Sequence, residues 1–368
     1  MHPWPGAPFA AIRSAGHSPD MRWRAINTGN GVYDWQHLDG LITVSLLHGV
    51  DIVYTFMATP LWASTNPTGT GCAFGDGTCY APTAQSWEDF VTAITARYAG
   101  KIKYWELWNE PDALNFWSGT TPELVTMAEA AYPIIKAAHP DNVVLSPSPQ
   151  GPNAHLWIDK YFSSGGVPYT DAISFHGYLY GAPEIIGSLI ANVRAIQAKY
   201  SSLSGKPIWD TEHSFFGSLE WDVDEDRRAA WVARFLVLSA AAGIDRSFWY
   251  SWYGFDVGLN AGMLYNLSQQ KLLKPGMAYI EAHSWLVNAV IGAPTFSQGV
   301  HQVRVTRGGG YEALIVWASD PNPEFTALFV VPAQYTRYRT LDAATIPVVA
   351  GSTLMLTMKP IILEYDPA

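Results

Sequence analysis

Short apolar runs alternate with longer amphipathic segments from residue 9 to about residue 290. The apolar runs predict strands at residues 9–14, 51–57, 102–110, 142–147, 172–178, 207–213 and 247–253. Strands that alternate with helices indicate parallel strands joined by right-handed crossovers.

The segments between these strands carry the start and stop signals of helices. Thr121-Pro122-Glu123 places a proline in a first helical turn with an acidic residue beside it, and Gly243 is suited to end a helix. The predicted helices span residues 121–138, 183–200, 224–242 and 277–290.

The repeated strand–helix unit predicts a (β/α)8 TIM barrel. A doubly wound open sheet would more often show a glycine-rich phosphate loop after its first strand, and this sequence has none there. Seven strands are recognisable, so the eighth is either missing from the chain or formed by a segment without a clear strand pattern.

The pattern changes after about residue 292. Strands are predicted at 301–306, 311–318, 324–331, 337–341 and 353–365, separated by turns such as Gly308-Gly309-Gly310 and without helix signals. This pattern is typical of a small β-sandwich. We therefore expect a catalytic barrel over residues 1–292 and a β-sandwich accessory domain over residues 293–368.

Composition narrows the class of protein. Hydrophobic residues make up 48% and charged residues 15% of the chain, which favours a large buried core over disorder. The net charge is −10 and the basic residues are scattered, which argues against nucleic acid or an anionic membrane as partner. The sequence shows neither an apolar run of membrane-spanning length nor a signal-peptide core.

Cys72 and Cys79 are seven positions apart in a glycine-rich loop. We expect a local disulfide, which would favour a secreted or periplasmic location, while a pair of unrelated thiols is the alternative. A zinc site needs about four ligands, and the sequence offers no others nearby.

Two strands end in glutamate. The aromatic run at 104–111 closes with Asn109-Glu110-Pro111, and the run at 207–213 reaches Glu212. In a barrel, catalytic residues lie at the carboxyl ends of the strands. A retaining glycosidase needs two carboxyl groups about 5–5.5 Å apart, one protonated and one ionised. We assign Glu110 as acid/base and Glu212 as nucleophile.

Polar neighbours support this pair. Asn109 could bind a sugar 2-hydroxyl, but strand alternation turns it away from Glu110 unless the strand end bulges or twists. A hydroxyl of Tyr178 or an N–H of His176 could hold the nucleophile ionised, and Arg13 could do so through its charge.

Glu106 lies four residues before Glu110, and Asp210 lies two residues before Glu212. We expect them to point into the barrel and to make internal hydrogen bonds.

Aromatic residues make up 14% of the chain. Most must be core, because each buries a large area. Trp62 and Trp252 are candidates for platforms that stack on a sugar ring, and Trp249 competes with Trp252 for that role. For each of them packing is the alternative.

Residues 108–111, 209–212 and 59–63 resemble stretches of clan A glycoside hydrolases, in particular glycoside hydrolase family 39 and its relatives. The resemblance implies retention of configuration, no metal or organic cofactor and a β-sandwich beside the barrel. It also implies that the strand of Arg13 is the second of the barrel. His213 departs from the family, which often has a small residue there, and would narrow the subsite next to Glu212.

These observations predict a retaining β-glycosidase that acts on an oligosaccharide or polysaccharide. The predicted cleft offers few basic residues, so a neutral, xyloside-like sugar is favoured over a uronic acid. A non-catalytic carbohydrate-binding protein on a degenerate barrel is the alternative from a different class. A transglycosylase would use the same residues.

Overall fold

The computed structural model describes residues 4–178, 181–214, 224–253, 263–319 and 325–365. The chain forms two compact units. The first is built mainly from Phe9–Gly177 and Ala191–His213, and the second mainly from Tyr178–Ile190 and Ser214–Ala368. The division into a barrel over residues 1–292 and a sandwich over 293–368 stays a prediction.

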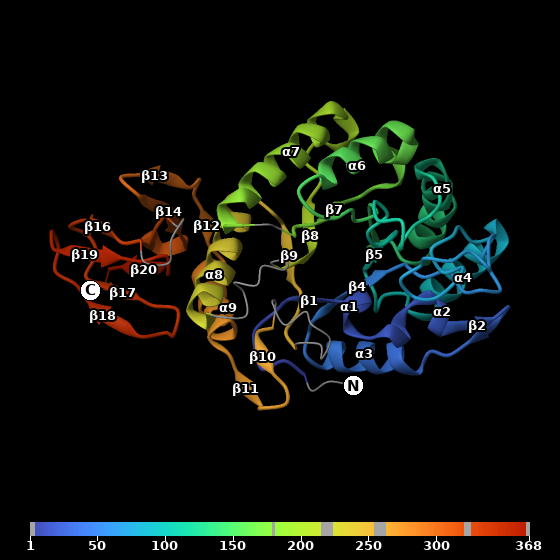
Figure 1. The fold of residues 1–368 in the computed structure, drawn as a ribbon, viewed down its shortest axis with the longest axis horizontal. Helices are drawn as coiled ribbons and strands as arrows, with labels where there is room; N and C mark the ends of the chain where they lie inside the picture. The colour runs from blue at the N-terminus through green and yellow to red at the C-terminus, as the bar shows by residue number, and fades with distance from the viewer. Residues whose placement is uncertain (1–3, 179–180, 215–223, 254–262, 320–324, 366–368) are drawn as a thin grey trace. The chain divides into compact units, whose positions relative to one another are not determined.

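Parallel strands form the centre of the first unit. In spatial order, a sheet contains β1 (Ala11–Arg13), β4 (Asp51–Thr55), β5 (Tyr104–Glu106) and β6 (Val143–Leu145). A parallel bridge from Leu145 to Ala172 continues the series towards β7 (Ile173–His176), which pairs in parallel with β8 (Ile208–His213). Neighbours in space thus follow one another along the chain, as the alternating pattern predicts (Figure 1).

All seven predicted strands are present, the last being β9 (Arg246–Trp249) in the second unit. Several are shorter than predicted. The strand expected over 102–110 is regular only over β5, because the backbone then departs from the ladder and Glu110 takes the left-handed conformation with φ of 44°. An apolar run shows that a segment is buried, but not where its pairing stops.

Helices connect the strands. They are α3 (Gln36–Leu47), α4 (Ala84–Arg97), α5 (Thr121–Ala138), α6 (Ala154–Tyr161), α7 (Ile186–Lys199), α8 (Glu225–Ala241) and α9 (Lys274–Leu286). The prediction for α5 is confirmed at both ends. Thr120 and Glu123 form a capping box there, in which each side chain accepts from the backbone N–H of the other. The order also contains short elements: α1 (Ser14–His17), α2 (Trp23–Ile26), β2 (Asn27–Gly29) and β3 (Val32–Tyr33).

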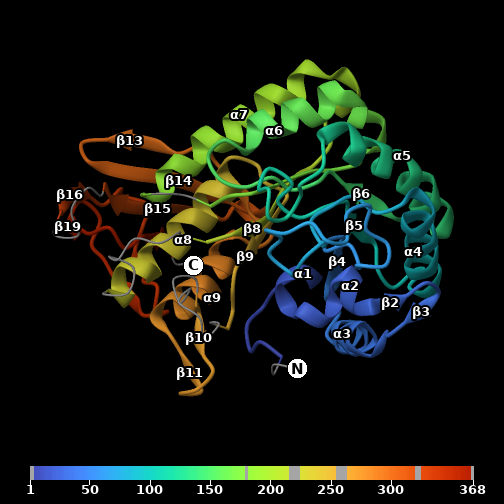
Figure 2. The ribbon, with the colours of Figure 1, turned by 45° about the vertical axis from the view of Figure 1, so that its right-hand side comes forward.

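An aromatic cluster packs α4 against the parallel strands. The ring of Trp23 stacks on Phe90 with centroids 4.9 Å apart, and Phe56 meets Trp87 edge-on at 4.9 Å. All four residues are buried. Figure 2 shows α4 and α5 side by side next to β4, β5 and β6. Much of the high aromatic content is therefore core.

The second unit contains the paired helices α8 and α9 and a sheet-rich C-terminal part. Its larger antiparallel sheet has β12 (Val290–Ile291), β14 (Val300–Thr306), β15 (Glu312–Ala318), β20 (Ile361–Glu364), β17 (Arg337–Arg339) and β18 (Thr345–Pro347) in that order, with β13 (Thr295–Ser297) on β14. β16 (Ala327–Val330) and β19 (Thr353–Leu356) form a smaller sheet, and β10 (Tyr265–Asn266) pairs with β11 (Lys271–Leu272). Buried residues of both C-terminal sheets share one core cluster, which includes Val316, Leu356 and Leu363.

The prediction of one strand over 353–365 was wrong. This segment forms β19 and β20, which lie in different sheets. Pro360 precedes β20 and has no backbone N–H to continue a ladder. The apolar pattern continues across the break because both halves face the same core.

Cys72 and Cys79 form a disulfide, so this prediction is confirmed. The bond lies in the long connection between β4 and α4. The segment that it closes contacts the loop after β5, since Ser118 donates its backbone N–H to the carbonyl of Cys79 and Ala73 does the same to Asn115. No helix in the described parts of the chain is long and apolar enough to cross a membrane.

We expect the disulfide to stabilise the folded chain by about 2 kcal/mol, because it restricts a short loop of the unfolded state. Thermal unfolding of the native protein should shift to lower temperature in dithiothreitol. The double variant Cys72→Ala/Cys79→Ala should unfold at that lower temperature with or without the reductant. An equal response of variant and native protein to dithiothreitol would contradict this prediction.

Candidate active site

Glu110 lies in the turn that follows β5. Its φ of 44° is uncommon for a residue other than glycine, and its N–H donates to the carbonyl of Ser148 at 2.9 Å. Asn109 forms a parallel bridge with Ser148, and both Asn109 and Glu110 are buried. This local twist brings two consecutive side chains into the interior, which the sequence predicted to be possible only if the strand end departs from regular alternation.

Glu212 lies in β8 next to an irregularity in the pairing with β7. Phe175 pairs with Asp210, whereas His176 pairs with Glu212, so Thr211 is an extra residue in β8. Such a bulge changes the direction of the side chains that follow it. It places Glu212 opposite His176.

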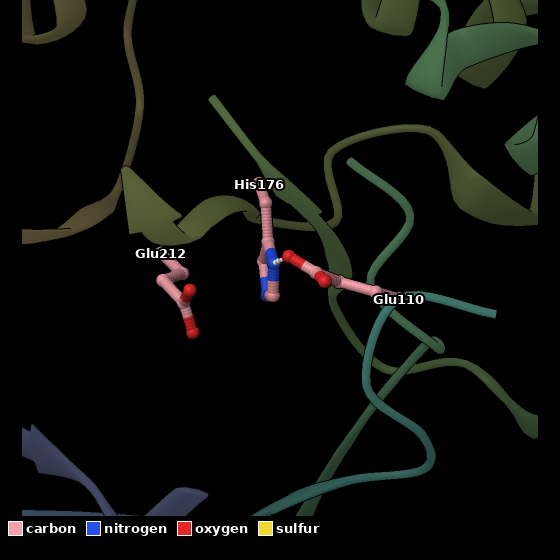
Figure 3. A group of neighbouring side chains, drawn as sticks. All are labelled: Glu110, His176 and Glu212. Atoms are coloured by element: carbon pink, nitrogen blue, oxygen red, sulfur yellow. Dashed lines mark hydrogen bonds and ion pairs between the residues drawn. The ribbon is translucent and has the colours of Figure 1, made fainter. Parts of the chain in front are cut away.

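Glu110, His176 and Glu212 converge from the loop after β5, from β7 and from β8 (Figure 3). One carboxylate oxygen of each glutamate and a ring nitrogen of His176 all lie within 4.8 Å of one another. The residues that the sequence assigned as acid/base and nucleophile are therefore neighbours in space.

His176 Nδ1 is 2.8 Å from Oε1 of Glu110. The sequence suggested that this histidine could serve the nucleophile, but this hydrogen bond goes to the other glutamate. A neutral imidazole that donates Nδ1–H to Oε1 leaves the second carboxyl oxygen as the site for a proton.

The guanidinium of Arg13 binds side chains from β5, from the turn after it and from β8. Its guanidinium donates to Oε2 of Glu212 at 2.5 Å, to Oε2 of Glu106 at 2.6 Å and to Oδ1 of Asn109 at 2.8 Å. Thr55, at the end of β4, adds a hydroxyl donor to Glu106 at 2.8 Å. The expected contact of Arg13 with the nucleophile and the expected internal role of Glu106 are both present.

Oδ1 of Asn109 accepts a hydrogen bond from Arg13 and is therefore not available to a sugar hydroxyl. Its remaining NH2 group is the part of the side chain suited to a 2-hydroxyl. Thr55 was missed by the sequence analysis, although a threonine that ends an apolar strand is a signal of a polar group at the carboxyl edge of the sheet.

Burial and charge separate the two glutamates. Burial raises the pKa of Glu110 to about 7, against the opposing effect of Arg13 and with the support of the negative Glu106. Burial alone would raise the pKa of Glu106 as well, but Arg13 and His176 lower it overall. Burial lowers the pKa of His176, so this ring favours its neutral form. Glu212 accepts a hydrogen bond from the guanidinium of Arg13 at 2.5 Å.

This arrangement offers a group that titrates near neutral pH beside a second carboxyl group bound by a guanidinium. Glu110 titrates near neutrality and can give or take a proton. Glu212 is partly exposed, with 15% of its side chain accessible, and so can be reached by a substrate. The pair can therefore perform acid/base and nucleophilic chemistry on the same molecule.

Glu110, His176 and Glu212 could also supply three ligands to a divalent cation. Arg13 already neutralises Glu212 at 2.5 Å, and its pKa is raised by the carboxylates around it, although burial opposes this. A second cation would be repelled by this guanidinium. The expectation that the site needs no metal stays a prediction.

The predicted sugar platforms are less well defined. Trp62 lies in the first unit, is half-buried and donates its ring N–H to the carbonyl of Asn27 at 3.0 Å. Trp249 and Trp252 belong to the second unit, where they contact Phe235 and Tyr265 respectively. Tyr178 is buried, follows the end of β7 and also belongs to the second unit. The roles of these four residues in substrate binding stay predictions.

His213 does not line a subsite next to Glu212. Its side chain is fully buried, and its Nδ1 is 3.3 Å from Oδ2 of Asp210. The expectation that it narrows the subsite next to Glu212 was wrong. Consecutive side chains on a strand point to opposite faces, so His213 points away from the face of Glu212. Asp210 has the internal position that was predicted for it.

Comparison with known proteins identifies the fold. The chain resembles a family 39 glycoside hydrolase from the gut symbiont Bacteroides cellulosilyticus WH2, with a TM-score of 0.78 and 18% identity over 97% of this chain and 76% of that one. It also resembles a family 39 β-xylosidase from Caulobacter crescentus, with a TM-score of 0.68 and 17% identity over 98% and 89% of the two chains.

A family 30 subfamily 8 xylanase from Clostridium acetobutylicum is similar as well, with a TM-score of 0.63 and 16% identity over 96% of this chain and 95% of that one. A comparison with curated proteins found no match. The sequence profile of the family described as glycosyl hydrolase catalytic core matches residues 54–279. The chain therefore belongs to this glycosyl hydrolase family and has the fold of the clan A glycoside hydrolases, as the motifs around Glu110 and Glu212 predicted.

Proposed function

We propose that the protein is a retaining β-glycosidase in which Glu212 is the nucleophile and Glu110 the acid/base. The observation that carries this proposal is the approach of the two carboxyl groups, with an oxygen of each within 4.8 Å of the other. Retaining enzymes hold these groups about 5–5.5 Å apart, whereas inverting enzymes need about 6.5–9.5 Å to admit a water molecule between them.

In the first step, the Glu212 carboxylate attacks the anomeric carbon and forms a glycosyl ester. The glycosidic C–O bond breaks, and the leaving oxygen takes the proton of Glu110. Arg13 binds the attacking carboxylate and Oδ1 of Asn109, and in this proposal the NH2 group of Asn109 donates to the 2-hydroxyl of the sugar. Contacts of this kind lower the barrier when they strengthen in the transition state.

In the second step, water attacks the anomeric carbon and Glu212 leaves as a carboxylate. Glu110, now ionised, takes the proton of that water. A pKa of about 7 suits both roles, because the group can lose and regain a proton near neutral pH. If a sugar hydroxyl replaces water, the same residues perform transglycosylation.

We propose a neutral, xyloside-like sugar of an oligosaccharide or polysaccharide as substrate. Two of the similar structures are described as β-xylosidases, both from Caulobacter crescentus. Arg13 is engaged by three side chains and so is not placed to bind a uronate. We further propose that the parallel strands belong to a (β/α)8 barrel, and that the disulfide reflects a secreted or periplasmic location.

The two glutamates can be tested separately. We expect Glu212→Gln to reduce kcat on 4-nitrophenyl β-D-xyloside by more than about 10⁴-fold, because the nucleophile is lost. Glu110→Ala should lose activity on poor leaving groups and regain turnover when azide is added, since azide attacks the glycosyl enzyme without a base. Initial rates on a panel of aryl glycosides measure both effects.

Turnover that survives Glu212→Gln would contradict the proposed nucleophile. A folded native protein that binds xylo-oligosaccharides and turns over no member of the panel would favour the carbohydrate-binding alternative instead.

The pKa of Glu110 predicts the alkaline side of the pH profile. The acid form is needed for the first step, so kcat/KM should fall about tenfold per pH unit above about 7. Glu110→Ala assayed with a 2,4-dinitrophenyl xyloside, whose leaving group needs no proton, should lose this fall. An unchanged alkaline limb in the variant would show that another group controls it.

Metal removal gives a further test. Because Arg13 supplies the positive charge beside Glu212, dialysis against EDTA should leave kcat unchanged. Loss of activity in EDTA that a divalent cation restores would show that the three-residue cluster works as a metal site.

A further inference from the structure

A buried polar cluster adjoins Glu212 in the sequence and takes no part in the steps above. Asp210 and His213 lie on either side of Thr211 and Glu212, and both are fully buried. His213 Nδ1 is 3.3 Å from Oδ2 of Asp210. A buried carboxylate lowers the stability of the fold unless charges and hydrogen bonds compensate its burial. The presence of this pair beside Glu212 therefore calls for an explanation.

The end of β7 supplies the partner on the other side. The N–H of Gly177 is 2.9 Å from Oδ1 of Asp210 and 2.9 Å from the backbone carbonyl of Glu212. One donor therefore ties both the Asp210 side chain and the Glu212 backbone to β7. The approach is close, since a Cβ on residue 177 would lie 2.2 Å from Oδ2 of Asp210.

These contacts surround the bulge in β8. Phe175 pairs with Asp210 and His176 with Glu212, so Thr211 is accommodated between two anchored residues. Without the extra residue, the pairing would shift by one position and His176 would lie opposite Thr211. A shift by one residue turns side chains to the opposite face of a strand.

We propose that Asp210 and His213 are positioning residues that fix the bulge of β8 and thereby the orientation of the nucleophile Glu212. Asp210 fills the space that Gly177 leaves and binds the end of β7, while His213 lies against the Asp210 carboxylate from the same strand. The proposal rests on the proposed function, because it assigns these residues to the reaction of Glu212.

The electrostatics agree with this geometry. Asp210 contributes to raising the pKa of His176, although burial lowers it overall, and His176 binds Glu110. The charge of Asp210 therefore also acts on the histidine that binds Glu110.

If Asp210 and His213 only stabilised the fold, their substitution would lower the unfolding temperature and leave kcat unchanged. If they position Glu212, their substitution lowers kcat.

Asp171 offers a control for this comparison. It precedes β7 at the opposite end of the strand, where its carboxylate binds Tyr132 at 2.8 Å, Lys136 at 3.0 Å and the N–H of Val144 at 3.0 Å. Asp171→Asn removes a hydrogen-bonded carboxylate next to β7, the strand that pairs with β8, at the end of β7 away from His176.

The experiment compares Asp210→Asn, His213→Gln and Gly177→Ala with Asp171→Asn. Asp210→Asn keeps an acceptor for the N–H of Gly177 but removes the negative charge. Gly177→Ala displaces the Asp210 side chain without changing it. For each variant we would measure kcat and KM on 4-nitrophenyl β-D-xyloside, the unfolding temperature, and the rate of covalent labelling by 2,4-dinitrophenyl 2-deoxy-2-fluoro-β-D-xyloside.

We expect Asp210→Asn and Gly177→Ala to lower kcat and the labelling rate by about 100-fold, the usual effect of a displaced reacting group. KM should change by less than about threefold, because substrate binding is retained. Asp171→Asn should unfold at lower temperature and keep kcat. The double variant Asp210→Asn/His213→Gln should be no slower than Asp210→Asn, since the two residues act as one unit.

Folded Asp210→Asn and Gly177→Ala with native kcat and labelling rate would overturn the proposal, as would losses no greater than that of Asp171→Asn. If Asp210→Asn does not fold, Gly177→Ala and His213→Gln decide by the same criteria. Failure of the proposed function is a separate result: the native protein would then not be labelled at Glu212 at all. Labelling of the native protein with no effect of the variants would reject only the positioning role.

Discussion

The buried guanidinium of Arg13 binds Glu106, Asn109 and Glu212, which come from β5, from the turn after it and from β8. A charge in this position has lost its water and must be neutralised by its neighbours. Removal of one member of such a buried pair usually costs about 3–5 kcal/mol, because the other is left uncompensated. The same contacts that offset the burial of Arg13 also hold Glu212, the proposed nucleophile, so folding and the proposed chemistry depend on one set of hydrogen bonds.

Glu110 and Glu212 are the same residue type and differ in their surroundings. Glu110 lies in the left-handed turn, and burial raises its pKa to about 7. Glu212 is bound by a guanidinium and remains partly exposed. The two proposed roles thus rest on burial and on one cation, without any difference in side-chain chemistry.

The approach of Glu110 to Glu212 could be predicted because its signal is local. An aromatic strand that ends in Asn109-Glu110-Pro111 and a second strand that reaches Glu212 place two acids at the same edge of a parallel sheet. The start of α5 is equally local, since Thr120 and Glu123 satisfy each other's backbone groups. In both cases the residues that decide the structure are neighbours in the sequence.

The details that the sequence did not reveal depend on contacts between distant segments. The hydrogen bond of His176 to Glu110 joins β7 to the loop after β5, and the extra residue in β8 has no signal in the sequence of that strand. The division of the segment after residue 353 between two sheets depends likewise on strands far away in the sequence. Periodicity indicates which side chains are buried, but pairing partners decide where a strand stops and how it bulges.

The anomeric configuration of the first product tests the central claim most directly. Proton NMR spectra recorded during the first minutes of hydrolysis of an aryl β-xyloside would resolve the anomeric signal before mutarotation. The account predicts the β-anomer first, because two displacements at the anomeric carbon restore its configuration. Initial formation of the α-anomer would show a single displacement by water, and the assignment of Glu212 as a covalent nucleophile would then be wrong.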